Sequence, residues 1–217
     1  MTLPRRHLLA AAFALAPGAV RAALPRLDFE AKRNGSLLGS HSVSFARTGA
    51  DLMVTIAVDY KVTLGPITLY RYALRGSEAW RGETLMEARF ETDDDGRRDF
   101  MRAKRGAGGL LSVEGSASGA YTAPEGSLPA SHWTRRELDA PMINPQNGEL
   151  LRFAVRDAGM SDVRTRDGRT FPARRFVLTG PSSLDLWYDE AGAWAGLQAV
   201  AKDGSLITYA RTQPPET

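Results

Sequence analysis

The stretch that decides the fold is residues 52–60, Leu-Met-Val-Thr-Ile-Ala-Val-Asp-Tyr. Alternate positions carry Leu52, Val54, Ile56, Val58 and Tyr60. In an extended strand these side chains all point to the same face of a sheet. β-branched and aromatic residues also fit a pleated, half-buried surface well. We therefore expect a strand with one buried face and one exposed face.

The same alternation recurs on both sides of that stretch. Leu27, Phe29 and Ala31 alternate with charged residues, and the turn Asn34-Gly35 follows them. Further strands are expected at 67–74, 85–92, 97–104, 110–114, 171–179, 184–188, 194–201 and 206–211. Short strands at regular spacing, separated by turn residues, are typical of all-β domains. The sequence predicts an all-β fold, either a single curled antiparallel sheet or an open or half barrel.

One stretch interrupts the strands. Residues 115–129 are rich in Gly, Ser, Ala and Pro, which predicts a flexible loop. Ser131 is expected to cap a short helix over residues 133–138, and a second short helix is expected to begin at Pro145. Each half of the chain has too few strands to close a core alone. Residues 23–217 are therefore expected to form a single β domain.

The N-terminus has the layout of an export signal. Arg5-Arg6 precede an uncharged run over residues 8–16, and small residues end at Ala22. A basic start, a short apolar run and a small-residue cleavage site predict a signal peptide over residues 1–22. The arginine pair favours the twin-arginine route, and the general secretory route is the alternative. We expect the mature chain to work in the periplasm without a transmembrane anchor.

Charge and cysteine content limit the partners. The chain has 28 Lys and Arg residues against 25 Asp and Glu residues. Residues 1–22 hold three of those arginines and no acid, so the remaining chain is formally neutral. A neutral balance gives no support for binding nucleic acid. There is no cysteine and hence no disulfide.

Few residues offer chemistry. Outside the signal the histidines are His41 and His132, and a packed or hydrogen-bonded histidine is the ordinary interpretation of each. Glu91, Asp93 and Asp95 imitate the start of a calcium loop, but the glutamate that should complete it is absent. No phosphate-binding glycine loop occurs in the sequence. We expect neither a metal nor a cofactor.

Several segments together resemble a known family. They are Asn34-Gly35 with Gly39-Ser40-His41, Ser131-His132-Trp133, and the ranges 144–148, 184–189 and 203–209. They are similar to a family of exported bacterial proteins known only as a domain of unknown function, over roughly residues 27–211. The resemblance implies one curved antiparallel sheet or open barrel in the cell envelope and no catalytic residues. A looser likeness, in architecture alone, is to periplasmic proteins that cradle lipids in half-barrels.

These observations favour a non-enzymatic envelope protein. A curled sheet with little helix to fill it leaves a cleft, so we expect its concave face to bind a lipid, another amphipathic ligand or an envelope protein. The expected binding residues are His41, His132, Trp133, Asp185, Trp187 and Asp189. Two alternatives remain open. One is a periplasmic hydrolase that pairs His41 or His132 with Asp185 or Asp189, and the other is a structural partner in an envelope complex.

Overall fold

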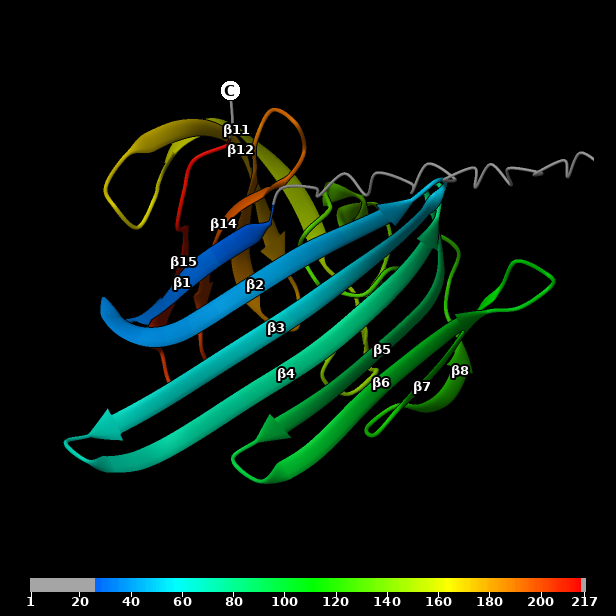
Figure 1. The fold of residues 1–217 in the computed structure, drawn as a ribbon, viewed down its shortest axis with the longest axis horizontal. Coiled ribbons are helices and arrows are strands. Elements are labelled where there is room, and N and C mark those ends of the chain that lie inside the picture. The colour runs from blue at the N-terminus through cyan, green and yellow to red at the C-terminus, as the bar shows by residue number, and fades with distance from the viewer. Residues whose placement is uncertain (1–25, 216–217) are drawn as a thin grey trace, which may run out of the picture.

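One antiparallel sheet dominates the computed structural model, which describes residues 26–215 (Figure 1). Within these residues, 13 strands form the sheet in the order β11-β12-β13-β14-β15-β1-β2-β3-β4-β5-β6-β7-β8. Their bounds are β1 Leu27–Arg33, β2 Ser36–Thr48, β3 Asp51–Leu64, β4 Ile67–Arg81, β5 Thr84–Asp94, β6 Arg97–Arg105, β7 Leu111–Gly115, β8 Gly119–Thr122, β11 Ala154–Arg164, β12 Thr170–Thr179, β13 Ser183–Tyr188, β14 Trp194–Val200 and β15 Leu206–Arg211. The all-β prediction is confirmed. The expected signal peptide lies outside the described residues.

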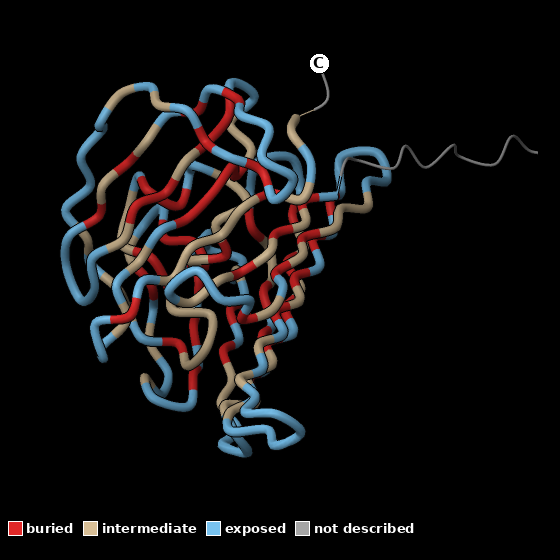
Figure 2. The backbone as a smooth tube through the Cα atoms, turned by 90° about the vertical axis from the view of Figure 1, so that its left-hand side faces the viewer, coloured by how far each residue is buried: buried red, intermediate tan, exposed pale blue. Residues whose placement is uncertain are grey.

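The sheet curls without closing. The last strand, β15, pairs with the first, β1, so both lie in the middle of the sheet. Among the described strands, β8 and β11 form its two edges. The curl gives the sheet a concave inner face and a convex outer face, and buried residues gather inside the curl (Figure 2).

The predicted alternation on β3 decides which side is inner. Val54, Ile56 and Val58 are almost fully buried, while the residues between them are more exposed. Their register partners across the sheet also face inward. On β4 the inward position opposite Ile56 is Gly76, where a Cβ atom would lie 2.1 Å from the Phe90 ring. Glycine at this position therefore lets Phe90 pack flat against the sheet.

Residues 123–153, here called the inner segment, fill part of the concave face. They include the 3₁₀ helix η1 (Arg135–Asp139) and the short strands β9 (Met142–Ile143) and β10 (Leu150–Leu151). Leu128, Met142 and Ile143 are buried in the same hydrophobic core as the inward side chains of the sheet. The expected open cleft is therefore largely occupied by the chain itself.

Three expectations about this part of the chain need correction. The predicted loop over residues 115–129 contains β8, and its Leu128 is buried. The short helix is a single 3₁₀ turn capped by the Thr134 side chain, not by Ser131. The Asn144 side chain accepts the Gln146 N–H at 3.0 Å, which forms a turn where a helix was expected. Such side chain–backbone bonds compete with helix formation.

A strand that the sequence analysis missed, β11, packs on the outer face. The β11–β12 hairpin folds back over β13 to β15, where the Arg166 N–H donates to the Arg211 carbonyl at 2.8 Å. A second, small core lies beneath it, formed by Val163, Phe171, Ala173 and Ala195 against Trp187. In the described part of the chain, no helix has the length and apolar character needed to cross a bilayer.

Candidate functional site

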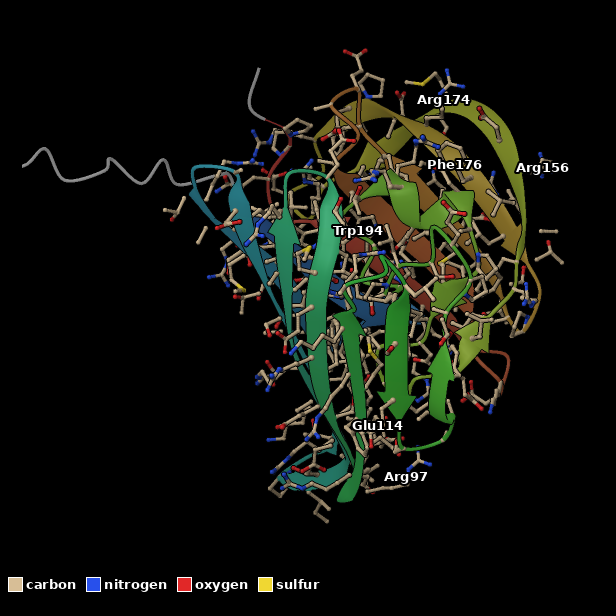
Figure 3. The ribbon with its side chains drawn as sticks, turned by 90° about the vertical axis from the view of Figure 1, so that its right-hand side faces the viewer. Arg97, Glu114, Arg156, Arg174, Phe176 and Trp194 are labelled. Atoms are coloured by element: carbon tan, nitrogen blue, oxygen red, sulfur yellow. The ribbon has the colours of Figure 1, made fainter. Side chains whose placement is uncertain are left out.

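His41 lies inside the curl of the sheet. It is on β2, it is 6% exposed, and its ring lies 4.9 Å from the Trp194 ring and 5.9 Å from the Tyr209 ring, centroid to centroid. Figure 3 shows Trp194 in this interior. Burial, with a smaller contribution from His132, lowers the pKa of His41 to about 3, so the ring is neutral near pH 7. Its Nε2 atom has no hydrogen-bond partner among the described residues.

His132 is held by a buried carboxylate. Glu137, which is fully buried, accepts the backbone N–H of His132 at 2.8 Å and lies 2.6 Å from its ring Nδ1. Tyr188 donates its hydroxyl to the same carboxylate at 3.2 Å. A carboxylate can only accept, so Nδ1 carries the proton in this pair. The two bonds fix His132 in a left-handed backbone conformation, with φ of 66°.

A second buried carboxylate, Glu78 on β4, lies at the base of the inner segment. Its Oε2 atom accepts the indole N–H groups of Trp80 and Trp133, both at 2.9 Å. Its Oε1 atom has no partner among the described residues. Burial raises the pKa of the Glu78 carboxyl, and the nearby Ser131 hydroxyl and the two indole donors oppose that rise. Trp133 thus ties the inner segment to the sheet.

Trp133 also forms a wall of a pocket at one end of the concave face. The pocket has a volume of about 510 Å³ and lies where β2 ends and β3 begins. We call it the mouth pocket and define it by the apolar residues Leu27, Phe45, Leu52 and Trp133 and the charged residues Arg47, Asp189 and Arg211. Its volume falls in the range usual for small-molecule sites.

The charged residues of the mouth pocket have different environments. Arg211 and Asp189 form a buried ion pair, with Nη1 and Oδ2 2.9 Å apart. Asp189 also accepts the backbone N–H of Ala193 at 2.9 Å. Arg47 is exposed, and no ion pair of Arg47 occurs among the described residues. A paired arginine and an unpaired one leave this end of the site with a net positive charge.

The structure separates two of the expected site residues from the others. Asp185 and Trp187 lie on the outer face of β13, because Leu186 and Tyr188 face the inner core. Asp185 pairs with Arg175, and Trp187 donates its indole N–H to Ser161 at 2.8 Å. His41, His132 and Trp133 share the interior, and Trp133 and Asp189 line the mouth pocket. Asp185 and Trp187 therefore belong to a different surface.

Sequence reasoning missed four residues of the interior and the pocket. Glu78 and Arg211 occupy inward positions of their strands, where the alternation otherwise places mainly uncharged residues. A charged residue at such a position is the signal that could have revealed them. Glu137 carried no such signal, because the short helix that contains it has no apolar alternation for a charge to interrupt. Arg47 looked like an ordinary surface arginine near a turn.

Comparisons with known proteins identify a family and a fold. Residues 29–212 match the model of a family described as "Domain of unknown function (DUF6134)". A search of curated proteins finds no match. A solved structure described as a beta-barrel-like protein of domain of unknown function DUF1849 from Brucella abortus is similar, with a TM-score of 0.60 and 10% identity. The similarity covers 86% of this chain and 94% of that one, and at this identity it shows the fold alone.

Proposed function

The chain belongs to the DUF6134 family, and we propose that this member is an exported, non-enzymatic envelope protein that binds an amphipathic anion in its mouth pocket. The observation that carries the proposal is the composition of that pocket. Leu27, Phe45 and Leu52 offer apolar surface beside Trp133, and Arg47 stands free at the rim. Apolar lining with a few placed polar groups is typical of ligand sites.

The charge of the pocket selects the ligand's head group. The Arg211–Asp189 pair is internally neutral and needs no further partner. Arg47 is then the cation free to meet a ligand, and a guanidinium binds carboxylate or phosphate through paired hydrogen bonds. An alkyl chain would cover Phe45 and Leu52 while its anionic head lies on Arg47. The expected ligand class is a fatty acid or another single-chain lipid anion.

The hydrolase alternative draws less support from the same geometry. Its acids, Asp185 and Asp189, are each paired with an arginine. The His132 ring is hydrogen-bonded to Glu137, and among the described residues no hydrogen bond joins its other ring nitrogen to a hydroxyl. A serine hydrolase needs that nucleophile–base contact. The arrangement therefore resembles a structural brace of the inner segment more than a catalytic triad.

The binding proposal is tested by titrating the protein with dodecanoate while following the fluorescence of its tryptophans. Arg47→Glu should weaken binding about tenfold or more, since it replaces attraction of the head group by repulsion. The control is Arg156→Glu, an exposed arginine on β11 at the outer edge of the sheet (Figure 3). Equal affinity of the two variants, or equal binding of uncharged dodecanol by the unaltered protein, would contradict the proposal.

The export part of the proposal has its own test. Replacing Arg5 and Arg6 by lysine should block export if the twin-arginine route is used, because that recognition depends on the guanidinium groups. We expect cell fractionation to find that variant in the cytoplasm and the unaltered protein in the periplasm, where N-terminal sequencing should give a start at Ala23. Normal periplasmic levels of the lysine variant would leave the general secretory route.

A further inference from the structure

The hairpin formed by β3 and β4 projects beyond the rest of the sheet at the end opposite the mouth pocket (Figure 1). Pairing of β2 with β3 stops at Gly39 and Tyr60, and pairing of β4 with β5 stops at Tyr72 and Asp94. Residues 61–71, here called the hairpin tip, therefore pair with each other, and beyond that the Arg71 carbonyl accepts the Asp95 N–H at 2.8 Å. The tip turns at Gly65, whose φ of 58° suits glycine.

The end of this tip is apolar and exposed. Leu64, Ile67 and Leu69 are 68%, 60% and 56% exposed. Single exposed apolar residues are common on protein surfaces, but three of them gathered on a projecting turn form a patch. A patch of this kind costs solubility unless something covers it.

The base of the tip carries positive charge. Lys61 and Arg71 are direct cross-strand partners, and no acidic residue occurs between Tyr60 and Tyr72. No ion pair involving either cation occurs among the described residues. Like charges placed directly opposite each other destabilise a sheet. Acids near the base of the tip lie at the turn between β5 and β6, where Asp94 already pairs with Arg97 and accepts the Tyr70 hydroxyl. A cation pair without an ion-pair partner, beside an exposed apolar patch, suits an anionic partner.

We propose that the hairpin tip inserts into the surface of an anionic phospholipid bilayer. Leu64, Ile67 and Leu69 would enter the boundary between head groups and acyl chains, and Lys61 and Arg71 would lie among the anionic head groups. Leu64 lies three positions after Lys61 in the sequence, which is about 10 Å along a strand. Interfacial segments bury their apolar side about 5–10 Å deep, so the spacing fits.

The aromatic residues on both sides of the cation pair agree with this placement. Tyr60, Tyr70 and Tyr72 lie at the base of the tip with partly exposed side chains, and Tyr70 donates its hydroxyl to Asp94 at 2.7 Å. Tyrosine is enriched at the level of lipid head groups because one end of its ring is apolar and the other polar. The order from the turn is therefore apolar first, followed by a zone that holds both the cations and the tyrosines, which follows the polarity of a membrane surface.

A bilayer fits the shape of the tip better than a protein surface does. The apolar residues stand on a narrow convex projection, which a fluid interface can surround without a preformed pocket. The pocket proposed to bind a ligand lies at the other end of the strands, so membrane contact would leave it accessible. The two proposals rest on different residues, and either can fail alone.

Co-sedimentation of the protein with vesicles tests the inference. We expect binding to vesicles of phosphatidylglycerol mixed with phosphatidylcholine and much weaker binding to phosphatidylcholine alone. Replacing Lys61 and Arg71 by glutamine should lower the partition coefficient about 25-fold, since each cation near an anionic surface contributes on the order of 1 kcal/mol. The charge-matched control replaces Arg156 and Arg164, both exposed on β11, by glutamine.

The apolar part is tested by replacing Leu64, Ile67 and Leu69 with serine, which should lower partitioning by about tenfold or more. The control is Leu110→Ser, since Leu110 is similarly exposed, at 62%, but lies in the turn after β6 at the opposite end of the strands. A melting temperature close to that of the unaltered protein shows that each variant is folded. The inference would be overturned if the tip variants bound vesicles as strongly as the unaltered protein. It would also be overturned if the protein bound neutral and anionic vesicles equally. If the unaltered protein is a dimer and only the substitutions in the tip make it monomeric, the tip binds a second copy of the chain and the inference is overturned.

Discussion

The inner and outer faces of β13 carry polar contacts that differ in how deeply they are buried. On the inner face, Tyr188 meets the inner segment and donates to Glu137, a carboxylate with no exposed surface. On the outer face, Asp185 meets Arg175, whose side chain is 41% exposed. The inner segment excludes water from the inner face of β13, whereas the β11–β12 hairpin covers the outer face only in part. The difference shows that a covering segment, not the sheet itself, decides how deeply a charge is buried.

This comparison also separates two kinds of polar contact. The inner carboxylates accept from ring and backbone N–H groups of the segment that buries them, so their hydrogen bonds hold the segment in place. The outer carboxylate, Asp185, is itself largely buried, but it pairs with an arginine on the neighbouring strand β12 whose exposed guanidinium water can reach. Breaking an inner contact should therefore cost far more than breaking an outer one.

The largest expected effect tests this difference directly. Glu137→Gln keeps the size of the side chain but sets an amide N–H against donors that now meet a carboxylate oxygen. We expect it to lower the free energy of unfolding by about 2–4 kcal/mol, measured by urea denaturation. Asp185→Asn, the matched change on the outer face, should cost no more than about 1 kcal/mol. Similar losses for the two variants would mean that both faces are equally sheltered.

The next effect concerns the acid side of stability. Burial lowers the folded-state pKa of His41 to about 3, while the unfolded chain titrates near 6.5. Below pH 6.5 the unfolded state therefore binds a proton that the folded state refuses, and stability falls as the pH drops toward 3. At pH 5 this amounts to a loss of about 2 kcal/mol relative to pH 7.

His41→Leu removes the titrating ring and should flatten this acid slope in unfolding curves measured between pH 7 and pH 5. Because Nε2 has no partner among the described residues, the variant should keep its stability at pH 7. The control is His132→Leu, which breaks the bond to Glu137 and should lose stability at both pH values. An unchanged slope in His41→Leu would show that another group causes the acid sensitivity.

Much of this arrangement follows from the sequence. The alternation over residues 52–60 correctly predicted an inward face on β3, and on β2 the alternate residues His41, Val43 and Phe45 follow the same rule, which is why His41 lies inside the sheet. The strand β11 was not predicted from the sequence, because most of its residues are exposed and a bulge near Gly159 breaks the alternation. Apolar and polar residues alternate along a strand because one of its faces is buried. A strand that is exposed on both faces therefore shows little alternation.

The candidate site was harder to predict, for a different reason. Asp185 and Asp189 look alike in sequence, yet one lies on the outer face and the other in the mouth pocket, because β13 ends between them. Glu137 lies in η1, five residues after His132, and His132 lies before that helix, so no helix or strand period connects the two residues. Contacts made by an irregular segment depend on where the whole segment packs, which local patterns do not encode.

The smallest effect compares the two tryptophans that were expected to share one site. Trp133→Phe removes an N–H donor from Glu78, and Trp187→Phe removes the bond to Ser161 on the outer face. In urea denaturation at neutral pH, we expect Trp133→Phe to lower the free energy of unfolding by about 1–2 kcal/mol and Trp187→Phe to lower it by about 0.5 kcal/mol.

The pH dependence of the two losses distinguishes the two variants further. Because burial already raises the pKa of Glu78, the folded state disfavours its charged form, and stability falls as the pH rises above the unfolded value of 4.5. Loss of the Trp133 donor raises that pKa further, so Trp133→Phe should cost more at pH 8 than at pH 5, while the cost of Trp187→Phe should not change. Equal costs of Trp133→Phe at the two pH values would mean that Glu78 stays protonated throughout, or that water replaces the indole.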